Sequence, residues 1–209
     1  MQKLRKKRKY EGNPVGLSDE ACKEIASDLD RHLAALWVMY AQYHKHHWLV
    51  EGPQFRDLHL FLQAHYEEVN LQLDAVAERI TLLGYTPSTR LDKYQALSYI
   101  PQEDEDVFHI RESLEHDMHN ERKIAVEFRK SIKLCIKHDD FGTKSMLEGF
   151  LFKIEDRCHH LEHFLGDDDL AVGWLHSAAD AAEKDGDDVS EKPNRKNGKA
   201  KPAKAKAKK

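Results

Sequence analysis

Four side chains in the first half of the sequence have the types and the spacing of a metal site. His47 and His59 flank Gly52-Pro53, a pair that ends helices, so one imidazole is expected at the end of a helix and the other near the start of the next. Asp74 and Glu78 are four residues apart, which puts both carboxylates on one face of a helix. Histidines and carboxylates with open coordination positions suit Fe(II) that reacts with an oxidant, and zinc or manganese accept the same ligands.

Helix geometry decides how these four groups can meet. His59 and Asp74 are separated by about 22 Å along one predicted helix, so a single chain cannot place both on one ion. Two antiparallel copies related by a two-fold axis can, with His59 of one copy beside Asp74 and Glu78 of the other. The sequence therefore predicts a site shared between copies. In the alternative interpretation the histidines are ordinary helix-end residues and the carboxylates form an exposed acidic face.

A metal site inside a four-helix bundle is the main rival. Such a di-iron site uses Glu-x-x-His on two helices and a Glu on each of the other two. The sequence has no Glu-x-x-His and contains only Asp106-x-x-His109 and Asp156-x-x-His159. On two antiparallel helices these motifs would be about 20 Å apart along the bundle axis. This rival is therefore weak. Four other histidines are expected at the surface or at helix ends: His32, His44, His138 and His176.

Apolar residues at helical spacing predict four long helices to carry these groups. Ser18, followed by two acids, is a helix start, and Gly84 is a helix end. A short turn joins the last two predicted helices, and a long linker with a short helical turn near 90–96 joins the middle two. The sequence shows no alternating pattern that would predict a strand. The pattern indicates an all-α four-helix bundle with a long crossover, and the helices are expected at about 18–51, 54–83, 103–137 and 139–165.

Charge divides the chain into an acidic body and two basic ends. Of 33 basic and 37 acidic residues, the segments 1–10 and 191–209 hold fifteen basic and one acidic, which leaves a net charge of −18 on the body. We expect a basic flexible tail over 1–16, the bundle over 17–170 and a disordered Lys-rich tail over 171–209. Because the charge of the tails is opposite in sign to that of the body, we favour tails that bind a partner. The alternative is that the tails only keep the protein soluble.

The last tail has the composition of a phosphate-binding segment. It lacks aromatic residues that could stack on bases, so any binding to nucleic acid is expected to be independent of sequence and sensitive to salt. Several tails on one assembly would strengthen the contact by avidity. The cationic residues are Lys192, Arg195, Lys196, Lys199, Lys201, Lys204, Lys206, Lys208 and Lys209.

The composition also indicates the compartment. No stretch approaches the roughly 20 apolar residues of a membrane helix, and the basic N-terminus is not followed by the apolar segment of a secretory signal. Cys22, Cys135 and Cys158 lie far apart and form no CxxC, so we expect reduced core cysteines in a cytoplasmic protein.

Four segments together resemble one known family. Residues 47–55 (HWLVEGPQF), 58–59 (LH), 74–79 (DAVAER) and 83–84 (LG) are similar to the DNA-protecting starvation proteins (Dps), a branch of the ferritin-like proteins, and a looser likeness covers about 18–168. The resemblance implies a ferritin-like bundle assembled into a dodecamer from two-fold dimers. It implies Fe(II) oxidation, commonly by hydrogen peroxide, at intersubunit sites with mineral storage inside. It also implies DNA binding by Lys-rich tails, and hence association with the nucleoid.

Within this resemblance, the ferroxidase ligands are residues matching His47 and His59 of one chain and Asp74 and Glu78 of the next. Gln63 stands where the family usually has Asp, and a neutral amide is a poorer ligand for a hard cation.

Two further residues near this site, His159 and Trp48, each have two interpretations. His159 stands where the family usually has Trp, and it could either replace the lost ligand or be a buried, hydrogen-bonded histidine. Trp48 could pack in an interface, which we favour, or donate electrons near the iron.

Three hypotheses follow. The first is a ferroxidase that stores iron and protects DNA from oxidative damage. The second is a nucleoid-compacting DNA-binding shell whose metal site is weak because of Gln63. The third is an assembly protein that binds zinc or manganese.

Overall fold

A computed structural model describes residues 13–166, which form one compact unit. The helices are α1 Asp19–Leu49, α2 Phe55–Leu82, α3 Leu91–Leu97, α4 Ile110–Lys137 and α5 Phe141–Phe164. The described part contains no strand, and the all-α prediction is confirmed. Residues 1–12 of the predicted N-terminal tail, the predicted end of the bundle at 167–170 and the whole predicted C-terminal tail, with His176 and its nine cationic residues, lie outside the described residues. No helix of residues 13–166 is long and apolar enough to cross a membrane.

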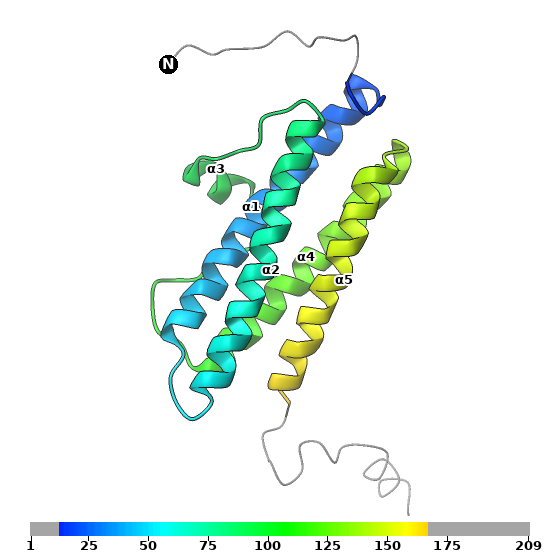
Figure 1. The fold of residues 1–209 in the computed structure, drawn as a ribbon. Coiled ribbons are helices and arrows are strands. Elements are labelled where there is room, and N and C mark those ends of the chain that lie inside the picture. The colour runs from blue at the N-terminus through cyan, green and yellow to red at the C-terminus, as the bar shows by residue number, and fades with distance from the viewer. Residues whose placement is uncertain (1–12, 167–209) are drawn as a thin grey trace, which may run out of the picture. The chain divides into compact units, whose positions relative to one another are not determined.

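The four long helices form two hairpins that pack on each other. α1 pairs with α2, α4 pairs with α5, and the hairpins meet through α1 with α4 and α2 with α5 (Figure 1). The segment from 83 to 109 runs from the end of α2 back along the bundle to the start of α4, with α3 against α1. This is the long crossover predicted from the sequence.

The helix ends are fixed by local hydrogen bonds. The Ser18 hydroxyl accepts the backbone N–H of Ala21 at 3.1 Å and caps α1. The Asp140 carboxylate accepts the N–H of Thr143 at 2.9 Å and caps α5. It also accepts from Arg79 Nη2 at 2.7 Å, so the cap of α5 also ties the end of α2 to the start of α5.

α4 begins at Ile110, and the prediction of a start near 103 was wrong. Glu103 lies in the crossover, where its carboxylate accepts from Lys45 Nζ at 2.6 Å, His116 Nδ1 at 2.8 Å and His46 Nε2 at 2.9 Å. Burial opposes the ionisation of Glu103, but these donors outweigh it and lower its pKa from 4.5 to about 2. The acid that looked like part of a first helical turn is an anchor between α1, α4 and the crossover.

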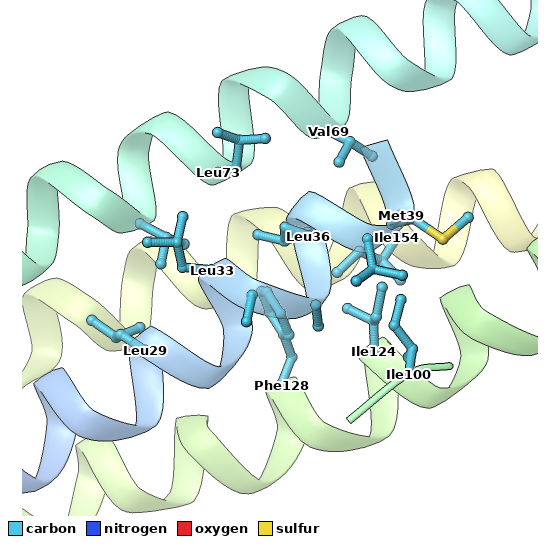
Figure 2. Close-up of a cluster of buried hydrophobic side chains, with 14 of the residues drawn as sticks. Leu29, Leu33, Leu36, Met39, Val69, Leu73, Ile100, Ile124, Phe128 and Ile154 are labelled. Carbon is cyan, nitrogen blue, oxygen red and sulfur yellow. The ribbon is translucent and has the colours of Figure 1, made fainter. Parts of the chain in front are cut away.

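The apolar core runs along the centre of the bundle between the two hairpins. Each side chain fully removed from water there contributes roughly 1.5–3 kcal/mol. The central side chains in Figure 2 come from all four long helices and the crossover: Leu29, Leu33, Leu36, Met39, Val69, Leu73, Ile100, Ile124, Phe128 and Ile154. Cys22 and Cys135 are buried and Cys158 is half-buried.

His32 is part of this core, so its predicted surface position was wrong. It is fully buried, with Nδ1 2.7 Å from the Tyr99 hydroxyl and Nε2 2.6 Å from the Ser131 hydroxyl. Since Tyr99 belongs to the crossover and Ser131 to α4, the imidazole joins the crossover to the bundle.

A buried ion pair lies within the same bundle. Arg157 on α5 is 1% exposed, and its Nε and Nη2 donate to the two carboxylate oxygens of Glu121 on α4 at 2.6 and 3.1 Å. Its Nη1 donates to Glu68 of α2 at 2.7 Å, and the Tyr43 hydroxyl of α1 donates to Glu121 at 2.8 Å. Burial disfavours the guanidinium charge, but Glu121 outweighs burial and raises the pKa of Arg157. The guanidinium therefore joins α5 to α2 and α4, and its partner Glu121 extends the network to α1.

Replacing Arg157 by Leu should destabilise the protein strongly. The change leaves the Glu121 carboxylate buried without its cation, which costs about 3–5 kcal/mol of unfolding free energy. Arg129→Leu is the matched control, because Arg129 pairs with Glu155 at the surface, where both side chains are about half exposed, and the loss should stay below about 1 kcal/mol. Urea unfolding followed by circular dichroism measures both. Equal losses would contradict the central role of Arg157.

Candidate metal centre

The break between α1 and α2 brings His47 and His59 together. Gly52 adopts φ +99°, a left-handed conformation that glycine favours, and the chain reverses between Leu49 and Phe55. The two imidazole rings stack with their centroids 3.6 Å apart and their planes 22° apart. His47 is buried and His59 is half-buried. Two residues twelve positions apart thus form one pair at the turn.

A reciprocal pair of hydrogen bonds fixes these rings. His47 Nδ1 lies 2.8 Å from the carbonyl oxygen of His59, and His59 Nδ1 lies 2.9 Å from the carbonyl oxygen of His47. The His47 carbonyl is in the last turn of α1, where helix carbonyls lack a partner within the helix. We call this arrangement the histidine clasp.

The clasp determines which nitrogens are free. A carbonyl oxygen can only accept, so each Nδ1 must carry the hydrogen, and in the neutral ring each Nε2 keeps its lone pair. Metal-binding histidines usually donate their other ring N–H to such an acceptor, which fixes the ring for coordination. His47 and His59 therefore present two Nε2 atoms in the state that a metal ion requires.

Asp74 and Glu78 lie on the exposed face of α2. They are one helical turn apart, and among residues 13–166 neither carboxylate forms an ion pair. The same face carries Gln63, whose amide donates to Glu67 at 2.8 Å. Unpaired carboxylates here are accessible to a cation or to another protein surface.

The structure brings the two histidines together, but it does not bring the carboxylates to them. α2 is continuous from Phe55 to Leu82, so His59 and Asp74 are separated by about 22 Å along it. In residues 13–166 no group of three or more His, Cys, Asp or Glu side chains is close enough to hold a metal ion. One chain thus holds the histidine pair and the carboxylate pair apart, and we call them the two candidate half-sites.

His159 and Trp48, the two residues with alternative interpretations, are both exposed. The His159 ring lies beside those of His160 and His163, and the structure shows no contact between it and Gln63. Trp48 is 69% exposed, with its ring 5.1 Å from that of His44.

His44 was predicted at the surface or a helix end but is a half-buried neighbour of the clasp. Its ring stacks on Tyr66 at 3.8 Å and lies 6.5 Å from the ring of His47. Neither of its ring nitrogens has a hydrogen-bond partner among the described residues. Burial, followed by the neighbouring His47, lowers the pKa of His44. Only its position one turn before His47 could have indicated this in the sequence.

Comparisons with known proteins agree with this architecture. A family model described as a ferritin-like domain matches residues 26–171. The DNA protection during starvation protein of Halobacterium salinarum is 40% identical over 153 residues, covering 73% of this chain and 84% of that protein. The nutrient stress-induced DNA-binding protein of Nostoc sp. is 34% identical, covering 79% of this chain and 90% of that protein. The crystal structure of an archaeal Dps homologue from Halobacterium salinarum has a TM-score of 0.73 and 36% identity, covering 79% of this chain and 95% of that one.

Mixing two defective chains should restore metal sites. A chain with His47→Ala and His59→Ala keeps only the carboxylate half-site, and a chain with Asp74→Asn and Glu78→Gln keeps only the histidine half-site. When the two are unfolded and reassembled together in equal amounts, about a quarter of the wild-type sites should return, because half of the pairs are mixed and each mixed pair has one intact site. Anaerobic Fe(II) binding by equilibrium dialysis measures this. If the mixture binds no more Fe(II) than either defective chain alone, the two half-sites do not combine.

Proposed function

The chain belongs to the Dps family of the ferritin-like superfamily, and from this we propose that it is a ferroxidase and iron-storage protein whose metal sites form between subunits. The observation that carries the proposal is the histidine clasp, which orients two Nε2 lone pairs. The site is His47 and His59 of one subunit with Asp74 and Glu78 of another. Gln63 and His159 are additional candidates for its edge. The subunits assemble from two-fold dimers into a dodecamer.

Fe(II) is the substrate of this site. Neutral imidazoles bind it while the carboxylates supply the negative charge that favours Fe(III) as oxidation proceeds. Hydrogen peroxide accepts two electrons, so two Fe(II) and one peroxide with two protons give two Fe(III) and two waters. Two-electron consumption of peroxide avoids the hydroxyl radical that a one-electron reaction would release, which protects DNA. The Fe(III) is then stored as mineral within the assembly.

Trp48 is proposed to act at the interface between subunits. It is the most exposed aromatic ring beside the clasp, and aromatic side chains are enriched where protein surfaces are buried on association. Electron donation to the iron site is its second proposed role.

A DNA-binding shell is the second candidate function. Gln63 places an amide where the family usually has a carboxylate, and this favours a weaker site or one that holds zinc or manganese. In this case the protein compacts the nucleoid, in the cytoplasm, through its cationic tails and does not depend on iron chemistry. The relatives named as DNA-protecting and DNA-binding proteins support the tail proposal for either function.

Peroxide-driven iron oxidation tests the first function. After anaerobic loading with Fe(II), the wild-type assembly should oxidise iron rapidly when peroxide is added, and His59→Ala should lower the rate by about 100-fold because one Nε2 ligand is lost. His119→Ala is the matched control, since His119 is an exposed histidine of α4 that takes no part in the clasp. Stopped-flow absorbance of Fe(III) follows the reaction. If the wild type is no faster than iron in buffer, the ferroxidase proposal fails and the DNA-binding shell remains.

Removal of residues 186–209 tests DNA binding. Full-length protein should retard duplex DNA in a gel at about 50 mM salt and lose most of that binding by about 200 mM, because phosphate contacts release counterions. The truncated protein should not retard DNA at either salt concentration, since it keeps only the six cations of residues 1–10 beside a strongly acidic body. Its rate of iron oxidation should equal that of the full chain. Retardation by the truncated protein that survives at 200 mM salt would contradict binding through the tail.

A further inference from the structure

The last two turns of α5 carry three histidines, at 159, 160 and 163. His159 and His163 are one turn apart, both are exposed, and their Nε2 atoms lie 3.2 Å from each other. His160 points to a different side, where its ring faces those of Phe61 and His65. Only His159 and His163 therefore bring ring nitrogens together.

The separation of these two nitrogens is that of two ligands on one metal ion. Zinc–nitrogen bonds of 2.0–2.1 Å at tetrahedral angles place two ligand nitrogens about 3.3 Å apart. The ring planes of His159 and His163 are 82° apart, and the ring centroids are only 4.3 Å apart. The two rings therefore contact each other edge to face, and it is the separation of their Nε2 atoms that matches two ligands of one ion.

A shared proton is the other way to explain this contact. In a neutral imidazole one ring nitrogen carries hydrogen and the other a lone pair, so Nε2–H of one ring could donate to Nε2 of the other. That hydrogen bond requires one ring to carry its hydrogen on Nε2, whereas metal binding requires both rings to carry it on Nδ1. When both rings carry their hydrogen on Nδ1, the two Nε2 lone pairs are available to one cation.

The surroundings favour a cation and leave space for its other ligands. His163 is in the last turn of α5, where the helix dipole is negative. A surface cavity of about 440 Å³ adjoins it, lined by Phe61, His160, His163 and Phe164. Both His159 and His163 are exposed, so water can reach the remaining coordination positions. The helix holds His159 and His163 one turn apart, which keeps their side chains on the same face as neighbours.

The pair is separate from the half-sites on α2. His163 shares its cavity with Phe61, whereas Gln63 is two residues further along α2, a rotation of about 200° around the helix. His59, Gln63, Asp74 and Glu78 occupy that other face of α2.

We propose that His159 and His163 form a second metal site on α5, which binds a divalent transition metal that prefers imidazole ligands, with Zn²⁺ as the representative ion. Imidazole suits zinc, copper and nickel, and two histidines one turn apart on a helix are a known arrangement for zinc. Two protein ligands with water in the remaining positions make this an accessible site. It holds metal whether or not the chain oxidises iron.

Zinc binding to single-histidine variants tests the proposal. Wild type, His159→Ala, His163→Ala and the control His160→Ala are dialysed against Zn²⁺ as full-length assemblies, and bound zinc per chain is measured by elemental analysis. His159→Ala and His163→Ala should each bind one Zn²⁺ fewer per chain than wild type, and His160→Ala should bind the same amount. Circular dichroism and assembly size confirm that each exposed substitution leaves the fold intact.

The outcomes separate the alternatives. Loss of zinc in His159→Ala but not in His163→Ala would overturn the pair and assign His159 to the site near Gln63. If neither variant binds less zinc than wild type, the contact between His159 and His163 is a hydrogen bond only, and the proposed zinc site is wrong. His163→Ala should oxidise iron at the wild-type rate, so failure of the ferroxidase proposal and failure of the zinc site give different results.

Discussion

The buried guanidinium of Arg157 constrains where this protein can bind metal. It occupies the bundle interior and takes both oxygens of Glu121, the fully buried carboxylate of α4. In many four-helix bundles, carboxylates in this region are free to hold metal ions. Here they balance a permanent charge, and losing either partner would leave an unpaired ion in a low-dielectric environment. The interior of the bundle is thus committed to stability, and the proposed metal sites lie on its surface.

The histidine clasp shows how a turn can prepare half of a metal site. It uses a carbonyl that the end of α1 leaves without a helical partner, so the same hydrogen bond closes the turn and fixes a ring. Both Nε2 atoms are oriented before any metal arrives, which lowers the entropy lost on binding. The carboxylates of Asp74 and Glu78 stay on a distant part of the same rigid helix. Proposed function and proposed assembly are therefore coupled, because only a second subunit can complete the site.

Features determined by local sequence could be predicted, and those determined by distant contacts could not. Ser18 and Gly84 mark helix ends through their own backbone and side-chain chemistry, so α1 and α2 were placed within a few residues. Glu103 looked like the acid of a first helical turn because its partners Lys45 and His46 are more than fifty residues away. His32 looked like a surface residue for the same reason, since Tyr99 and Ser131 satisfy it from 67 and 99 residues away. The spacing of His47 and His59 about a helix break indicated their proximity, but the reciprocal bonds to carbonyl oxygens required coordinates.

The most direct test of the shared site is anomalous diffraction at the iron edge from crystals of the assembly loaded anaerobically with Fe(II). The account predicts a peak bonded to Nε2 of His47 and His59 of one subunit and to carboxylate oxygens of Asp74 and Glu78 of its two-fold neighbour. A peak inside one bundle, beside Glu121, would contradict it. So would iron bound by the histidines of one subunit with the carboxylates of every neighbouring subunit out of reach.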